Sequence, residues 1–322
     1  MRILIAPDKF KGTADARTVC EAMADACRAA GHDVVVQPMA DGGEGTLDAL
    51  GGANRTSTVT GPLGEPVEAA WRLDGRRAVI EMAAASGLTL AGGPEANDPV
   101  AATTAGTGEL IDIAIKRGAR NIVVAVGGSA TTDGGLAAID AMHPIQRLRG
   151  VDLTVACDVR TMFVEAAEVF GPQKGASPAQ VELLRRRLDR LAQIFFEERG
   201  VDVGSVPRAG AAGGLAGGLF SVGAQLVDGF EVVAEEVDLY GKILASDLVL
   251  TGEGRVDDTS FAGKVVGGVV DLAIDVGVPV VVIAGASDMA DPPVPVHTLV
   301  DEVGADRALT NTVAAIAEVT GA

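Results

Sequence analysis

Short aliphatic runs recur along this chain, and each is followed closely by glycine or aspartate. The runs are rich in Val, Ile and Leu and lie at 2–6, 34–36, 121–126, 153–156, 248–250 and 280–283. Uninterrupted apolar runs of this length are typical of strands buried on both faces of a parallel sheet. A helical pattern from about Ala14 to Ala30, stopped by Gly31, lies between the first two runs. The sequence therefore predicts an α/β protein.

The middle of the chain follows a different pattern. Residues 55–80 contain Pro62, Gly64 and Pro66 between short alternating runs, which predicts hairpins. Residues 180–197 form an amphipathic pattern, with an apolar face made of Val181, Leu184, Leu188, Leu191 and Phe195. We therefore place a second α/β domain at 67–244, inserted into a first domain made from 1–66 and 245–322.

Composition and charge exclude several classes of protein. Apolar residues make up 48% of the chain, so it is predicted to be globular, and its net charge of −18 argues against nucleic acid as a partner. No apolar stretch reaches the roughly 18 residues of a membrane span, and the N-terminal run is too short for a signal peptide. The cysteines Cys20, Cys27 and Cys157 are predicted to be buried free thiols in a reducing compartment, so we expect a cytoplasmic protein.

The polar clusters after the strands are the candidate site. They lie at 8–12, 41–46, 127–135 and 252–257. Ligands of open α/β sheets bind beyond the carboxyl ends of the strands, where glycine N–H groups bind anions and aspartate binds magnesium. Lysines are present as Lys9, Lys11, Lys174 and Lys264. Amide groups, lysines and carboxylates are the parts that phosphoryl transfer needs.

Each cluster taken alone has a simpler explanation, since a glycine pair is often a tight turn and an aspartate or serine often caps a helix. The chain lacks the P-loop, the dinucleotide fingerprint and the protein-kinase motifs. A nucleotide-dependent dehydrogenase should carry that fingerprint. A sensor without catalysis would need the turns but not the carboxylates and lysines, and it remains an alternative.

Six segments in order resemble the type I glycerate kinase family. They are 6–13, 40–46, 127–135, 169–176, 209–214 and 251–257. The resemblance implies phosphorylation of D-glycerate by ATP with Mg²⁺, usually to 2-phosphoglycerate. It implies a Rossmann-like parallel-sheet domain with an inserted α/β domain and a site in the cleft between them. A homodimer is compatible with it, and another small hydroxy acid is the alternative substrate.

The resemblance and the residue types together give an expected site. The expected catalytic residues are Asp8, Asp41, Lys9, Lys11 and Lys174. One of the two carboxylates would accept the hydroxyl proton of glycerate, and the lysines, with Lys264 as an alternative, would neutralise anionic groups. The expected nucleotide-binding residues are Gly127, Gly128, Ser129, Thr131 and Lys264. The expected substrate-binding residues are Gly42, Gly43, Glu44 and Gly213, and magnesium is expected at one or two of Asp133, Asp158, Glu253 and Asp257.

The chain also departs from the family pattern. The connection from Gly135 to Val151 is shorter than in many members, and residues 159–167 lack a glycine-rich turn that many members have there. Arg208 stands where the family usually has glycine. We expect the altered segment to affect acceptor specificity.

Overall fold

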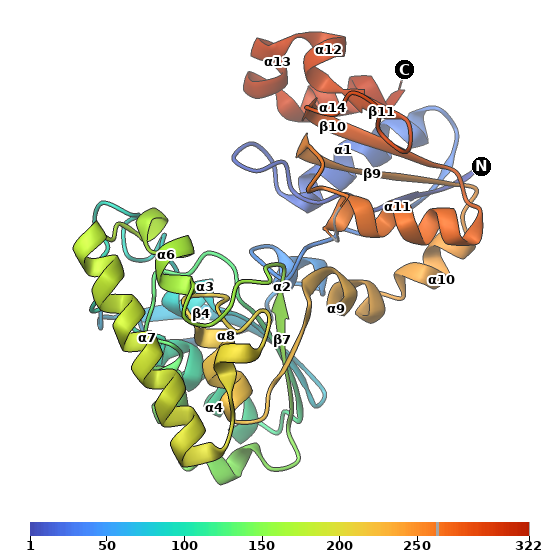
Figure 1. The fold of residues 1–322 in the computed structure, drawn as a ribbon. Coiled ribbons are helices and arrows are strands. Elements are labelled where there is room, and N and C mark those ends of the chain that lie inside the picture. The colour runs from blue at the N-terminus through green and yellow to red at the C-terminus, as the bar shows by residue number, and fades with distance from the viewer. Residues whose placement is uncertain (262–263, 322) are drawn as a thin grey trace. The chain divides into compact units, whose positions relative to one another are not determined.

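The computed structural model describes residues 1–261 and 264–321, and its chain folds into two compact units (Figure 1). Both are α/β, as the sequence predicts. Unit 1 comprises Met1–Asp41, Asp48–Leu50 and Phe230–Ala322, and unit 2 comprises Gly42–Leu47 and Gly51–Gly229.

Unit 1 is built on a parallel sheet of five strands in the order β11-β10-β9-β1-β2. The strands are β1 (Arg2–Ile5), β2 (Asp33–Val36), β9 (Leu248–Val256), β10 (Val280–Ser287) and β11 (Val296–Thr298). This is the doubly wound order 2-1-3-4-5, in which the winding direction reverses between β1 and β9. Ligands of such sheets bind at this reversal, beyond the carboxyl ends of the strands.

Helices cover both faces of the unit 1 sheet. One face packs on α1 (Ala16–Ala29) and α14 (Thr312–Gly321), and the other packs on α11 (Val265–Val276). The shorter helices are α9 (Gly229–Glu236), α10 (Leu239–Leu244), α12 (Leu299–Val303) and α13 (Ala305–Thr310), while α2 (Thr46–Ala49) joins the units in sequence. Helix α1 begins where the side chain of Asp15 accepts the N–H of Thr18.

Strand β9 extends further than the sequence indicates. The expected strand ends at Leu250, but pairing with β10 continues to Val256, with Gly252 opposite Ile283. A Cβ at Gly252 would lie 2.0 Å from the carbonyl oxygen of Ile283. The glycines here allow two strands to approach closely, so this cluster is not the anion-binding turn that the sequence predicts.

Unit 2 contains a mixed sheet of six strands in the order β3-β4-β5-β6-β7-β8. The strands are β3 (Arg55–Thr60), β4 (Pro66–Asp74), β5 (Arg77–Glu81), β6 (Asn121–Ala125), β7 (Asp152–Cys157) and β8 (Gln225–Asp228). The first three are antiparallel, which confirms the predicted hairpins, and β5 to β8 are parallel. Its α-helices are α3 (Ala83–Ser86), α4 (Ala105–Lys116), α5 (Leu136–Ala141), α6 (Ala166–Phe170), α7 (Pro178–Arg199) and α8 (Leu215–Ser221).

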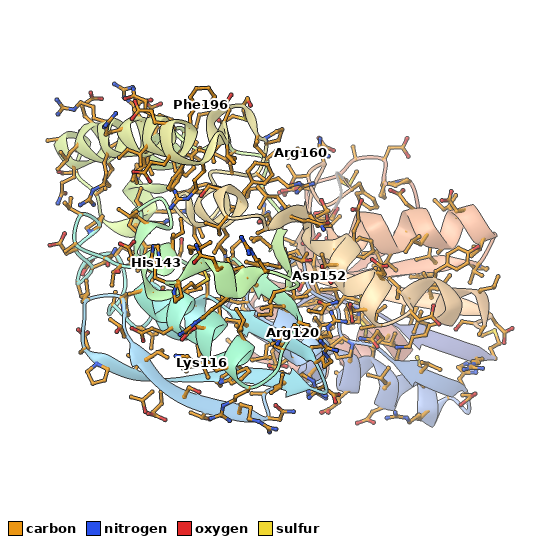
Figure 2. All side chains as sticks on the ribbon, turned by 90° about the horizontal axis from the view of Figure 1, so that it is seen from below. Lys116, Arg120, His143, Asp152, Arg160 and Phe196 are labelled. Carbon is orange, nitrogen blue, oxygen red and sulfur yellow. The ribbon has the colours of Figure 1, made fainter. Side chains whose placement is uncertain are left out.

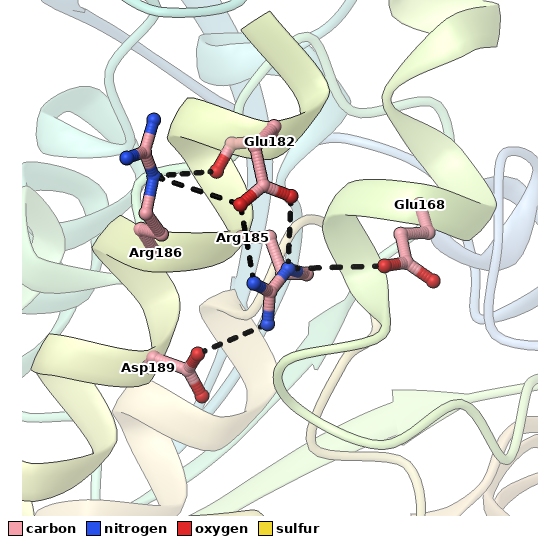
Figure 3. A network of polar contacts seen from close by, with 5 residues as sticks. All are labelled: Glu168, Glu182, Arg185, Arg186 and Asp189. Atoms are coloured by element: carbon pink, nitrogen blue, oxygen red, sulfur yellow. Dashed lines mark hydrogen bonds and ion pairs between the residues drawn. The ribbon is translucent and has the colours of Figure 1, made fainter. Parts of the chain in front are cut away.

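The long helix α7 confirms the amphipathic pattern. Its buried residues are Leu184, Leu188, Leu191 and Phe195, while Phe196 projects from the outer face (Figure 2). The arginines at 185–187 and 190 lie mostly on its solvated side. Arg185 pairs with Glu182 and Asp189 on the same helix and with Glu168 of α6 (Figure 3). Arg186 pairs with Glu182 and Arg190 with Glu197, whereas Arg187 donates to the carbonyl of Val100, as expected for a solvated helix face.

The two units divide the chain at different residues from those we expected, which were 66/67 and 244/245. Strand β3 pairs with β4 and so belongs to unit 2, although it precedes residue 67. Helix α10 packs beside α11 and so belongs to unit 1, although it precedes residue 245. The first difference comes from a hairpin between consecutive strands, and the second from the packing of α10 on the helix that follows β9.

Candidate functional site

Three acidic residues gather at the carboxyl edge of the unit 1 sheet. Asp8 follows β1, Asp41 follows β2, and Glu253 lies in β9. The N–H of Asp8 donates to the carbonyl of Gly252 at 2.9 Å, which fastens the segment after β1 to β9. Because β9, β1 and β2 are adjacent parallel strands, their ends bring these carboxylates together at the reversal of the sheet.

Burial raises the pKa of Asp8 to about 7. The positive charge of Lys9 and its backbone N–H oppose this rise, while the negative charges of Asp41 and Glu253 add to it. The Lys9 Nζ lies 3.9 Å from Asp8 Oδ1 and 4.0 Å from Asp41 Oδ1, so one ammonium group lies beside both carboxylates. A carboxyl group with a pKa close to neutral is suited to accept a proton at physiological pH.

The other predicted lysines of unit 1 lie on neighbouring loops. Lys11 is exposed on the segment between β1 and α1, which is anchored by the buried ring of Phe10. Lys264 directly precedes α11, and its Nζ donates to Thr259 Oγ1 at 3.2 Å. Its predicted neighbour Gly263 lies outside the described residues.

The residues predicted to bind magnesium do not form one cluster. Within 1–261 and 264–321, no three His, Cys, Asp or Glu side chains lie close enough together to hold a metal ion. Asp133 and Asp158 belong to unit 2, and Glu253 and Asp257 belong to unit 1. Within each unit, the described residues therefore supply no complete set of metal ligands from the protein alone.

Glu253 and Asp257 differ in their hydrogen bonds and in the direction of their pKa shifts. Burial raises the pKa of Glu253, and its Oε1 is buried with no hydrogen-bond partner among the described residues. Asp257 instead accepts the Thr259 hydroxyl and the N–H groups of Thr259 and Ser260, which lower its pKa. Asp257 therefore stabilises a turn. Glu253 retains an oxygen suited to a magnesium ion that is held mainly by phosphate, with one or two carboxylates.

In unit 2, the glycine-rich segment 127–135, which we call the glycine turn, follows β6. Its outer limb, Gly127–Ser129, donates no backbone hydrogen bond to any described residue. Gly128 has φ of 66°, and its carbonyl accepts the N–H of Leu88 at 2.8 Å. N–H groups without a backbone acceptor can bind an anion, so anion binding by this segment stays a prediction.

The segment 42–47 packs against the outer limb of the glycine turn. The carbonyl of Gly42 accepts the N–H of Val126 at 3.0 Å, and a Cβ at Gly127 would lie 2.6 Å from Gly43 Cα. The carboxylate of Glu44 lies beside Gly128, since a Cβ there would lie 2.3 Å from Glu44 Oε1. The structure thus brings together Gly42, Gly43 and Glu44, predicted for substrate, with Gly127 and Gly128, predicted for nucleotide.

The inner limb of the glycine turn, residues 130–135, is mostly buried, and so is Lys174 behind it. This differs from the ligand contacts expected of Thr131, Asp133 and Lys174. Thr131 and Lys174 are 0% and 2% exposed, and the hydroxyl of Thr131 has no partner among the described residues. Asp133 accepts hydrogen bonds from the N–H and hydroxyl of Thr104, and burial raises its pKa. These side chains support the turn from within, so direct contact of Thr131 or Lys174 with a phosphate, or of Asp133 with magnesium, does not fit this arrangement.

The remaining predicted residues of unit 2 are Gly213, Ser129 and Asp158. Gly213 lies behind the glycine turn, and a Cβ there would lie 2.0 Å from the carbonyl oxygen of Thr131. Ser129 is 9% exposed, and it caps no described helix. Asp158 is exposed at the carboxyl end of β7.

Sequence reasoning missed two residues that hold the site in place. Glu81 Oε1 accepts the N–H groups of Gly45 and Leu47 at 2.9 and 2.8 Å, which fixes the segment 42–47. Glu81 could have been predicted as a site residue from its position at the carboxyl end of β5. Asn97 Nδ2 donates to the carbonyls of Ala130 and Lys174, but it lies in an irregular segment with no pattern of its own.

The described helices include none that is long and apolar enough to cross a membrane. The three cysteines are buried and unpaired, as predicted.

Comparison with known proteins identifies relatives across most of the chain. The model of the glycerate kinase family matches residues 3–143 and 136–294. Glycerate 2-kinase of Escherichia coli K12 is 41% identical over an alignment that covers 89% of this chain and 85% of that protein. Glycerate kinase of Bacillus subtilis is 40% identical, again with 89% of this chain and 85% of the relative covered.

A solved structure is also similar to this chain over its whole length. The crystal structure of a putative glycerate kinase 2 from Salmonella typhimurium LT2 matches with a TM-score of 0.84 and 35% identity. The match covers all of this chain and 96% of the other. The two segments that match the family model meet at 136–143, within the connection that the sequence indicates is shortened.

Proposed function

Since the chain belongs to the glycerate kinase family, we propose that this kinase transfers a phosphoryl group from ATP to D-glycerate and forms 2-phosphoglycerate. The observation that carries the proposal is the position of the Asp8 carboxyl group, which is largely buried after β1 with Lys9 Nζ 3.9 Å from its Oδ1, and burial raises its pKa to about 7. A family match without an ionisable group tuned in this way would leave the proton transfer unexplained.

Asp8 is the proposed proton acceptor. Above pH 7 it is mostly a carboxylate, and a carboxylate can take the proton of a hydroxyl group as that oxygen attacks phosphorus. Lys9 lies between Asp8 and Asp41 and would offset the negative charge that the acceptor brings. Asp41, the alternative base, acts in this proposal by raising the pKa of Asp8.

The glycine turn is the proposed phosphate-binding element. Backbone N–H groups stabilise phosphate oxygens without adding a mobile charge. Magnesium would enter with the nucleotide and neutralise charge that develops on the phosphates. Glu253 of this chain offers a buried oxygen that has no hydrogen-bond partner in the described part of the chain.

A coupled assay of ADP release tests the proposal, with ATP, Mg²⁺ and D-glycerate supplied together. We expect release only with all three, and ³¹P NMR of the product should show 2-phosphoglycerate. Release with a different hydroxy acid alone would keep the kinase and reject the substrate, whereas ATP binding without release with any acceptor would favour a sensor.

The matched pair of variants is Asp8→Asn and Asp25→Asn. Asp25 is an exposed helix residue paired with Arg28, so its variant should behave as wild type. Asp8→Asn should lower kcat by about 10²- to 10⁴-fold, as expected for loss of a general base. Normal turnover of folded Asp8→Asn would show that Asp8 is not the base.

A further inference from the structure

Lys174 is a buried lysine directly behind the glycine turn. It ends the 3₁₀-helix η2 (Pro172–Lys174), and its side chain is 2% exposed. Its Nζ donates a hydrogen bond to the carbonyl oxygen of Thr131 at 2.6 Å and lies 5.9 Å from the ring centroid of Phe170. The ammonium group therefore points into unit 2 and contacts the backbone of the turn.

Burying an ammonium group is costly unless other groups compensate for the lost water. Here the environment lowers the pKa of Lys174 to about 7, chiefly through burial, and the negative charge of Asp133 offsets only part of this. A methionine of similar length would fill the same space without that cost. The polar end of Lys174 therefore needs an explanation other than packing.

The hydrogen-bond network gives that explanation. The carbonyl of Thr131 is enclosed by Lys174 Nζ on one side and by Gly213, which leaves no room for a side chain, on another. The preceding carbonyl, that of Ala130, accepts from Asn97 Nδ2 at 3.0 Å, and the same amide donates to the carbonyl of Lys174 at 2.9 Å. Two successive carbonyls of the inner limb are thus held by one connected set of donors.

These bonds fix the orientation of the peptide planes in the turn. In a trans peptide the carbonyl and the following N–H point in opposite directions. Holding the carbonyls of Ala130 and Thr131 therefore fixes the path of the inner limb. The outer limb, Gly127–Ser129, is continuous with it and carries N–H groups that have no backbone acceptor within the described chain.

We propose that Lys174 is a positioning residue, which orders the glycine turn for nucleotide phosphates through the Thr131 carbonyl without touching the phosphates. The proposal rests on the proposed function in one respect, that the glycine turn binds the nucleotide. It assigns Lys174 a different role from charge neutralisation at the reacting phosphoryl group.

The test compares Lys174→Met with the control Lys116→Met, whose lysine is a 59% exposed surface residue of α4 (Figure 2). We expect Lys174→Met to raise KM for ATP at least tenfold and to leave KM for glycerate within about twofold, with a smaller change in kcat. The thermal midpoint identifies a variant that has lost its fold. If kcat instead falls by about two orders of magnitude or more while KM for ATP is unchanged, the proposal is overturned, because that result would indicate action on the reacting group.

Amide hydrogen exchange of residues 127–135 without nucleotide gives a readout independent of activity. We expect exchange in this segment to rise at least tenfold in Lys174→Met and not in Lys116→Met. Asn97→Ala should act in the same direction, and the double variant should add little, because both residues hold one network. Unchanged exchange and unchanged KM in folded Lys174→Met would refute the inference.

Failure of the proposed function has a different signature. If wild-type protein binds no ATP by calorimetry, the proposed nucleotide role of the turn fails. The exchange measurement would then still decide whether Lys174 orders the turn.

Discussion

The opposing effects of Lys9 and Asp41 on Asp8 allow a test in which two variants shift one pKa in opposite directions. Lys9 lowers the pKa of Asp8, and Asp41 raises it. If Asp8 is the base, kcat/KM for glycerate should rise with pH through the pKa of Asp8, near 7 in wild type. Lys9→Met should move that rise to higher pH, and Asp41→Asn should move it to lower pH.

The magnitude follows from the geometry. The Lys9 Nζ lies 3.9 Å from Asp8 Oδ1, and Lys9 and Asp8 side chains are 27% and 13% exposed. Two charges about 4 Å apart interact by about 4 kcal/mol at an effective dielectric constant of about 20, which corresponds to about 3 pKa units. Solvent and salt screen a partly exposed lysine, so we expect an upward shift of about 1 unit in Lys9→Met.

The assay is initial ADP release between pH 5.5 and 9 at saturating Mg·ATP and low glycerate. Asp25→Asn serves as the control, and its profile should match that of wild type. Shifts of the same sign in Lys9→Met and Asp41→Asn would refute the reasoning, as would an unchanged rise in Asp8→Asn with residual activity.

Three further predictions concern stability. Because burial raises the pKa of Asp8 from 3.8 to about 7, the contribution of Asp8 to the unfolding free energy should fall as pH rises from about 4 to 7. A shift of about 3 units corresponds to about 4 kcal/mol, so urea unfolding at pH 8 should find Asp8→Asn more stable than wild type by about 2 to 4 kcal/mol, and equal stability would contradict this. Arg208 has φ of 75° and pairs with Asp228 at 2.9 Å. Arg208→Gly relieves backbone strain but breaks this partly buried ion pair, so we expect the unfolding free energy to fall by about 2 kcal/mol, and a rise in the urea midpoint would exclude this. Gly213→Ala should cost about 3 kcal/mol of stability, whereas Gly200→Ala, with a similar φ (70° against 66°) but open space, should cost about 1 kcal/mol; similar thermal midpoints would show that the contact with Thr131 is unimportant.

The sequence indicates which residues end strands, but not which strands are neighbours. Asp8 and Asp41 are readily placed at strand ends, because aliphatic runs precede both. Their meeting with Glu253 depends on β9 lying beside β1, a pairing between segments more than 240 residues apart. Strand order arises from packing of the whole sheet, so no local pattern could predict this group.

Lys174 shows a different limit of prediction from the sequence, which concerns the burial of a charged side chain. Lysine side chains are almost never fully buried, so a lysine in a glycine-rich motif is naturally expected to meet a ligand. Its burial follows from the packing of α6, η2 and α7 over the inner limb of the glycine turn. The donor that holds its backbone, Asn97, comes from an irregular segment that carries no periodic signal.

The sequence does not show which structural need a given glycine meets, because the absence of a side chain can serve several needs. At Gly128 the need is a positive φ in the outer limb of the glycine turn, whose N–H groups have no backbone acceptor among the described residues. At Gly252 the need is close approach, since a Cβ would lie 2.0 Å from the carbonyl of a paired strand. At Gly213 the need is space behind the carbonyl that Lys174 binds. Only the first of these is a candidate ligand contact, so a glycine cluster indicates where backbones must come close, and the hydrogen bonds of the surrounding chain decide whether a ligand can join them.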